Sequence, residues 1–146
     1  MDKYSKKKRS EIMSKIKSKD TAPELKVRSY LHYKGIRFRK NCKDITGNPD
    51  ICIRKYKIAI FVNGCFWHGH KNCKKFTMPK TNYHFWKSKI DSNIKRDRIN
   101  LNILAKKEWV SIIVWECQLE SSFKHTMNKL IYEIERQKSY VKNQSN

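Results

Sequence analysis

Cysteine and histidine residues gather in one short polar segment, and this cluster constrains the fold more than any other feature of the sequence. Cys65, His68, His70 and Cys73 fall within nine residues, and Cys117 follows the last expected strand. Zinc takes four nitrogen or sulfur ligands in a tetrahedron, and ligands two to four residues apart can close around it. The pattern therefore predicts a closed structural Zn²⁺ site of three cysteines and one histidine: Cys65, His70, Cys73 and Cys117.

The alternative is that these cysteines are buried and unreactive, which is common for free thiols. Zinc is favoured because residues 64–81 are polar and show no other means of becoming ordered. The cysteine count is five, an odd number, and the N-terminal sequence lacks the apolar stretch of a secretion signal. Metal binding is therefore favoured over a disulfide framework. The two remaining cysteines, Cys42 and Cys52, are expected to be thiols in the core.

Hydrophobic spacing predicts a mixed α/β sandwich. Helices are expected at 21–34, 82–107 and 122–138, and the first has a capping box made by Thr21 and Glu24. Strands are expected at 36–41, 50–53, 56–63 and 110–116. The short turn at 54–55 predicts an antiparallel hairpin. The continuous apolar run at 110–116 predicts a central strand.

The charge of the chain points to a polyanionic partner. Lys and Arg number 34 against 13 Asp and Glu, which gives a formal net charge of +21. Nucleic acid is the usual partner of such a surface. An anionic membrane is the alternative, but no apolar run approaches the roughly 20 residues that a membrane span needs. The absence of a signal peptide predicts a cytoplasmic protein.

The charge also suggests how the chain is divided. Residues 1–19 are strongly basic, and Ile12, Met13 and Ile16 lie at helical spacing. We expect a partly helical, DNA-contacting arm at 1–19, followed by a single domain at 20–146. The alternative for the first several residues is a solvated tail.

Candidate catalytic groups are few. Magnesium-assisted phosphodiester hydrolysis needs a carboxylate on a rigid element, near a group that activates water. Asp50 opens a strand directly after Pro49, although such a pair is usually only a turn. His68, left over when His70 binds zinc, can exchange protons near neutral pH; otherwise it joins the zinc ligands or faces solvent. Asp97 could orient His68, or it could be a surface salt-bridge partner.

Two strings in the sequence carry a specific resemblance: Gly64-Cys65-Phe66-Trp67-His68, and Trp115-Glu116-Cys117 near the end. The chain resembles the very-short-patch repair (Vsr-type) endonucleases, which nick DNA at T:G mismatches. The resemblance runs from about Arg9 to Leu119. Its other parts, in order, are residues 9–16, residues 17–24, Pro49-Asp50, Phe85-Trp86, Arg96-Asp97-Arg98 and Val114.

The resemblance implies a restriction-endonuclease-like core, in which a mixed sheet is flanked by helices and one structural zinc is bound by the four residues named above. It further implies that Asp50 is a Mg²⁺ ligand and that His68 is the general acid or base, with Asp97 as its supporting acid. Glu24 is implied as an accessory acid. Aromatic residues that wedge into the base stack correspond to Phe66, Trp67 and Trp86, and Met13 is implied as a wedge from the other groove.

This chain departs from the family pattern in places. Some members carry Thr-His before the Gly-Cys-Phe-Trp-His string, where this chain has Val62-Asn63. The backbone carbonyl of Val62 could still bind Mg²⁺, and Asn63 could hold a metal-bound water through its amide oxygen. One extra residue separates the second and third zinc ligands, which leaves His70 and His68 open as alternatives. Core packing is the alternative role of the three aromatic residues, above all of Trp86.

The resemblance implies a monomeric, Mg²⁺-dependent enzyme that nicks duplex DNA 5′ of the mismatched T. The lesion would be deaminated 5-methylcytosine, which links the enzyme to a DNA cytosine methyltransferase and to mismatch-repair accessory proteins. Two other functions stay open. One is a zinc-stabilised DNA-binding module without catalysis, and the other is a restriction-type nuclease that ignores mismatches.

Overall fold

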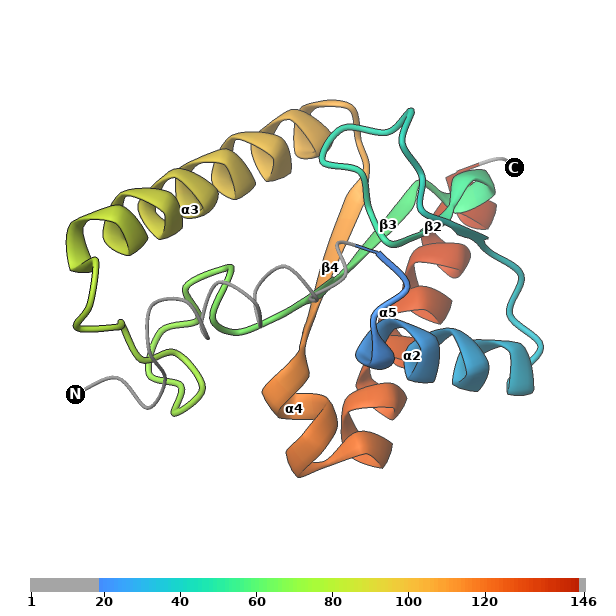
Figure 1. Ribbon diagram of the computed structural model, residues 1–146. Coiled ribbons are helices and arrows are strands. Elements are labelled where there is room, and N and C mark those ends of the chain that lie inside the picture. The colour runs from blue at the N-terminus through green and yellow to red at the C-terminus, as the bar shows by residue number, and fades with distance from the viewer. Residues whose placement is uncertain (1–18, 145–146) are drawn as a thin grey trace.

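The computed structural model describes residues 19–144 (Figure 1). The expected arm helix with Met13, and most of the proposed arm, lie outside the described residues. The elements are α2 (Ala22–Tyr33), β1 (Arg39–Lys40), β2 (Ile51–Ile53), the 3-10 turn η1 (Arg54–Tyr56), β3 (Ile58–Asn63), α3 (Tyr83–Lys106), β4 (Val110–Trp115), α4 (Glu116–Ser121) and α5 (Phe123–Gln144). No helix within the described range is long and apolar enough to cross a bilayer.

The sheet is mixed, and its order in the described part of the chain is β1-β2-β3-β4. The predicted hairpin is confirmed, because β2 and β3 pair antiparallel on either side of η1. β3 and β4 run parallel. The prediction that residues 110–116 form a central strand is wrong, since β4 is an edge strand of this sheet. The strand is nevertheless mostly apolar because it contacts both α3 and α5.

Helices cover the sheet on both faces (Figure 1). Strand side chains alternate between the faces. Ile58 and Ile60 of β3 therefore join the main core under α2 and α5, whereas Ala59 joins a smaller core that includes Leu104 of α3. The main core contains Val27, Leu31, Ile51, Ile53, Ile58, Ile60, Val62, Met127, Leu130 and Ile134, among others.

Helix α2 begins largely as the sequence predicts. The Thr21 hydroxyl accepts a hydrogen bond from the Glu24 backbone N–H at 3.4 Å. The Glu24 carboxylate, however, accepts the backbone N–H of Asp20 rather than that of Thr21. Two elements differ from expectation. The first strand is confined to Arg39–Lys40, and α4 precedes α5, which continues to Gln144.

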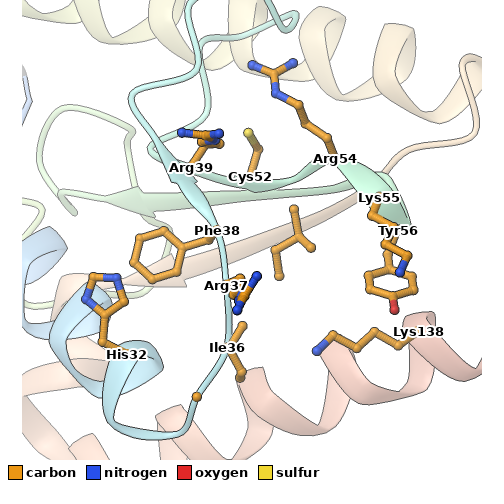
Figure 2. A pocket seen from close by; sticks show the side chains of 12 residues that line it. His32, Ile36, Arg37, Phe38, Arg39, Cys52, Arg54, Lys55, Tyr56 and Lys138 are labelled. Carbon is orange, nitrogen blue, oxygen red and sulfur yellow. The ribbon is translucent and has the colours of Figure 1, made fainter.

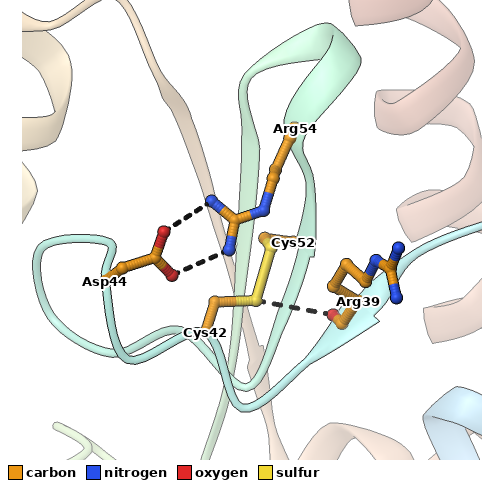
Figure 3. Close-up of a disulfide and its surroundings, with 5 residues drawn as sticks. All are labelled: Arg39, Cys42, Asp44, Cys52 and Arg54. Carbon is orange, nitrogen blue, oxygen red and sulfur yellow. Dashed lines mark hydrogen bonds and ion pairs between the residues drawn. A yellow bond between two sulfur atoms is a disulfide. The ribbon is translucent and has the colours of Figure 1, made fainter.

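Cys42 and Cys52 are buried, as expected, but they are bonded to each other as a disulfide (Figure 3). The prediction of two core thiols is therefore wrong. The bend after β1 brings the two cysteines together, because Cys42 donates its N–H to the Pro49 carbonyl. Beside the disulfide, Asp44 accepts two hydrogen bonds from Arg54, at 2.7 and 2.9 Å. The disulfide thus closes the loop that ends at Asp50.

We expect a Cys42→Ser/Cys52→Ser variant to be less stable than the oxidised protein by about 2–3 kcal/mol. A disulfide that joins residues 10 apart in sequence removes chain entropy of that size from the unfolded state. Urea unfolding measures the difference, with the reduced wild type as control. Five reactive thiols in the denatured, unreduced protein, instead of three, would rule out the disulfide.

Candidate active site and metal cluster

The four residues of the predicted zinc set lie together. The ligand atoms of Cys65, His70, Cys73 and Cys117 are all within 4.8 Å of one another. The Sγ of Cys117 is 3.4 Å from the Nδ1 of His70. Burial raises the pKa of the Cys65 thiol to about 12. A bound cation would reverse this preference, because thiols bind metals as thiolates. Three sulfurs and one imidazole nitrogen are a donor set that suits Zn²⁺.

The parallel pairing of β3 with β4 brings the residues of this cluster together. Asn63 is opposite Trp115, so Cys65 and Cys117 each follow two residues later at the same end of the sheet. The turn at Gly69 then returns the chain, and the His70 N–H donates to the Cys65 carbonyl at 2.9 Å. Gly69 has φ +58, and a Cβ there would lie 2.6 Å from Ile94 of α3. A larger residue at this position would displace the turn.

Two carboxylates meet beside the end of β3. Asp50 accepts the backbone N–H of Val62 at 2.7 Å, and its side chain shares a hydrogen bond with Glu24. Glu24 is only 3% exposed. Burial, together with the negative charge of Glu24, raises the pKa of Asp50 to about 7, although the hydrogen bond from Val62 and the charge of His68 oppose the shift. Near neutral pH, a proton is therefore bound to this buried pair in about half of the molecules.

A polar network that the sequence did not reveal holds this pair in place. Asp20 donates its N–H to Glu24 at 2.8 Å, and its carboxylate accepts from Arg28 and Asn41 at 2.8 and 3.1 Å. Asn41 in turn donates its N–H to the Asp50 carbonyl. The hydrogen bond from Asn41, and then that from Arg28, lowers the pKa of Asp20. Asp20 thus links the helix of Glu24 to the loop before Asp50.

We expect Asp20→Ala to lower the turnover rate of DNA nicking about 10–100-fold, with little change in KM. Loss of the link lets the two carboxylates separate, and misplacement by about 1 Å can cost that much. Steady-state kinetics over a Mg²⁺ series provide the measurement. Asp44→Asn, which removes an exposed carboxylate paired with Arg54, is the control. Wild-type turnover in Asp20→Ala would show that the network does not position the pair.

The histidine left outside the cluster pairs with the predicted acid. The Nδ1 of His68 lies 2.6 Å from an Oδ of Asp97, and both side chains are partly exposed. Asp97 lies in the middle of α3, and His68 lies in the turn after β3. With Nδ1 facing the carboxylate, Nε2 is the ring atom available for proton exchange. Between the two open alternatives, the structure brings His70 to the cysteines and His68 to Asp97.

The predicted wedge residues form one aromatic cluster next to His68. Ring centroids of Phe66, Trp67 and Trp86 are 5.5–5.8 Å apart, in edge-on contacts. Phe66 and Trp67 are half-buried, whereas Trp86 is 8% exposed. Asn93 of α3 donates to the Trp67 carbonyl at 3.0 Å. Trp86 therefore also serves as packing for the other two rings. Asn63 is buried at the end of β3.

Comparisons with known proteins identify relatives over most of the chain. Residues 1–75 match the family model described as DNA mismatch endonuclease Vsr. The chain is 46% identical over 129 residues to type II nicking enzyme V.NmeAIP of Neisseria meningitidis, which covers 87% of this chain and 91% of that protein. It is 38% identical over 134 residues to DNA mismatch endonuclease Vsr of Escherichia coli, which covers 92% and 85%. Type II nicking enzyme V.XorIIP of Xanthomonas oryzae is 42% identical over 118 residues, which covers 81% and 86%.

Sequence identity of this extent over most of the chain shows the reaction class. The chain is an endonuclease that nicks DNA. The expectation of a nucleic-acid partner, made from the net charge, is thereby confirmed. The chain belongs to the Vsr family of DNA mismatch endonucleases, whose fold is restriction-endonuclease-like. The mixed sheet flanked by helices agrees with the fold predicted from the sequence.

Proposed function

We propose that this protein nicks duplex DNA 5′ of the T in a T:G mismatch, by Mg²⁺-dependent hydrolysis, as the first step of very-short-patch repair. The lesion is deaminated 5-methylcytosine. The observation that carries the proposal is the convergence of the Glu24–Asp50 pair and the His68–Asp97 pair at one end of the sheet. The relative from Escherichia coli, which is named a mismatch endonuclease, supports the choice of substrate.

The carboxylate pair fits a divalent cation. Two buried acids in contact repel each other unless a proton or a cation lies between them. In this proposal Asp50 and the backbone carbonyl of Val62 bind Mg²⁺, Glu24 is the accessory acid, and Asn63 positions water through its amide. Mg²⁺ at this position would stabilise charge on the phosphate and acidify water.

Proton transfer is assigned to His68. Its Nδ1 is held by Asp97, so the ring is oriented and Nε2 can take a proton from water or give one to the leaving oxygen. Asp97 also stabilises the protonated ring. The Cys65, His70, Cys73 and Cys117 group is assigned to Zn²⁺ with a structural role, because a four-ligand site leaves no open position for substrate.

The aromatic cluster is assigned to mismatch recognition. A T:G wobble pair stacks weakly, so opening the helix beside it costs less than at a Watson–Crick step, where the cost is a few kcal/mol. Stacking of bases on aromatic faces returns about 1–3 kcal/mol per base. We assign Phe66, Trp67 and Trp86 to this wedge, with Met13 entering from the other groove. Basic side chains contact phosphates and carry no sequence information.

We propose that the enzyme acts as a monomer in the cytoplasm, because one nick needs one active site. It would work with a DNA cytosine methyltransferase and with mismatch-repair accessory proteins. In a reducing cytoplasm the Cys42–Cys52 disulfide would persist only through its burial.

Nicking assays on two end-labelled duplexes test the proposed function. One duplex carries a T:G mismatch in several sequence contexts, and the other is fully paired. We expect a single Mg²⁺-dependent nick in the mismatched duplex alone. The relatives named type II nicking enzymes make nicking without a mismatch requirement the second candidate. Cleavage of both duplexes would establish it, and tight mismatch binding without cleavage would establish a non-catalytic module.

We expect Trp67→Ala to weaken binding to mismatched DNA about 10–100-fold and binding to paired DNA far less. Loss of one stacked base accounts for an effect of this size. Fluorescence anisotropy with both duplexes measures the effect. Tyr132→Ala is the matched control, because it removes a ring that is 65% exposed on α5. Equal losses on the two duplexes would instead assign Trp67 to packing.

A further inference from the structure

A basic cavity lies at the far end of the hairpin from the candidate active site. It has a volume of about 820 Å³ and is bounded by residues 35–39, by η1 and by Lys138 of α5 (Figure 2). The β3 strand leads from η1 to Val62 and Asn63. At 3.3–3.4 Å per residue, η1 is therefore about 17 Å or more from the end of β3 where the site lies. The cavity is therefore a surface separate from the Glu24–Asp50 and His68–Asp97 pairs.

The charges that line the cavity have one sign. In the described part of the chain, no acidic residue lines the cavity. Five basic residues line it: Arg37, Arg39, Arg54, Lys55 and Lys138. Asp44 neutralises Arg54, and Glu135 approaches Lys138 only to 3.7 Å. Within residues 19–144, no carboxylate forms an ion pair with the other three. Such a concave surface concentrates anions.

The spacing of Arg37 and Arg39 fits a chain of phosphates. Figure 2 shows the segment from Ile36 to Arg39 running extended along the cavity. Residues two apart in an extended segment share a face and lie about 7 Å apart, comparable to successive phosphates of a nucleic-acid strand. Phe38, between them, also lines the cavity and stacks on His32 with ring centroids 4.6 Å apart. Arginine binds phosphate through two parallel hydrogen bonds.

An aromatic ring completes the opposite wall. Tyr56 has the ammonium groups of Lys55 and Lys138 each 5.6 Å from its ring centre, which holds both cations at the cavity. Ile36 and Ile53 are buried beneath it. Cations that follow a backbone beside an aromatic face are the combination found where proteins bind nucleic-acid strands.

We propose that this cavity is a second phosphate-binding site, which takes successive phosphates of a nucleic-acid strand outside the duplex held for nicking. Arg37 and Arg39 bind the phosphates, and Lys55 and Lys138 extend the contact across the cavity. The inference does not depend on the T:G specificity or the Mg²⁺ requirement proposed above. Either single-stranded DNA or the backbone of a second duplex could supply these phosphates.

Salt-dependent binding tests the site with two probes, a six-nucleotide dT strand and a fully paired duplex. In Arg37→Gln/Arg39→Gln, we expect the slope of log affinity against log salt to fall by about 1.4 for the strand, or about 1.8 for the duplex, as two phosphate contacts require. Lys129→Gln/Lys142→Gln removes the same charge from exposed positions of α5 and should change the slope much less. Equal slopes in the two variants for both probes would overturn the proposal.

Backbone amide NMR of the full chain locates the binding without relying on any variant. Titration with each probe should shift the amides of residues 35–39 and 53–56. Shifts from the dT strand alone would identify single-stranded DNA as the ligand, and shifts that appear only with a second equivalent of duplex would identify a second duplex. Shifts confined to residues around Asp50 and His68 would overturn the proposal. Because binding is read directly, a protein that fails to nick would leave this result unaffected.

Discussion

Asp50→Asn should abolish nicking and, at the same time, stabilise the protein above neutral pH in buffer without Mg²⁺. The substitution keeps the size of the side chain but removes the charge that we assign to Mg²⁺ binding. It also removes the repulsion between two buried carboxylates. One change would therefore lower activity and raise stability. This is common where the residues that a reaction needs destabilise the folded state.

The direction of the pH effect follows from the pKa shift. In the folded protein the pKa of Asp50 is about 7, compared with its ordinary value of 3.8. The folded protein therefore binds a proton at Asp50 that the unfolded chain releases at lower pH. This stabilising contribution is complete below about pH 4 and is lost as pH rises through 7. Each pKa unit corresponds to about 1.4 kcal/mol, so the Asn variant should gain about 2–4 kcal/mol over the wild type at pH 8. At pH 4 the gain should vanish.

Urea unfolding at pH 4 and pH 8 measures this difference, and the nicking assay measures activity. Asp91→Asn is the matched control, because Asp91 forms an exposed pair with Lys87 on α3. The same linkage predicts that wild-type activity requires more Mg²⁺ as pH falls below 7, since protons compete with the cation. A variant that nicks at the wild-type rate would refute the assignment of Asp50, and equal stability at pH 8 would refute its shifted pKa.

Cys117→Ser should lose the bound metal and most of the stability of the fold. Closed zinc sites contribute about 10–16 kcal/mol in small zinc-binding peptides, whereas a whole domain is stable by only about 5–15 kcal/mol. Cys117 is the second residue of α4, which follows β4 directly, so a bond from Cys117 to the proposed metal would tie β4 to the segment that carries Phe66, Trp67 and His68. Without the bond, ring contacts with Trp86 and two hydrogen bonds would be left to hold that segment to α3.

Elemental analysis and thermal unfolding measure these losses. The Cys42→Ser/Cys52→Ser variant is the matched control, because it removes two cysteines outside the cluster and should keep one equivalent of metal. Nicking should disappear in Cys117→Ser together with the fold, whereas Asp50→Asn should lose nicking with its metal content intact. One equivalent of zinc and an unchanged melting temperature in Cys117→Ser would exclude it as a ligand.

Much of the local structure could be predicted from the sequence. Thr21 caps α2, and the 3.6-residue spacing of Trp86, Ile90 and Ile94 marks α3, because these signals act within a few residues. The gathering of Cys65, His70 and Cys73 could be predicted for the same reason, since thiol and imidazole groups two to five residues apart are typical of a metal site. The place of β4 could not be predicted, because an edge strand covered by helices has the same apolar pattern as a central one.

The sequence by itself determined which elements form, which residue types the site contains and which polyanion the surface attracts. Only the tertiary structure decided which other distant side chains meet: Glu24 with Asp50, Cys42 with Cys52, and Asp20 with Asn41. The physical reason is that hydrophobic spacing fixes the buried face of an element but not its neighbour. Desolvation, which raises the pKa of Asp50, exists only once those neighbours have packed around it.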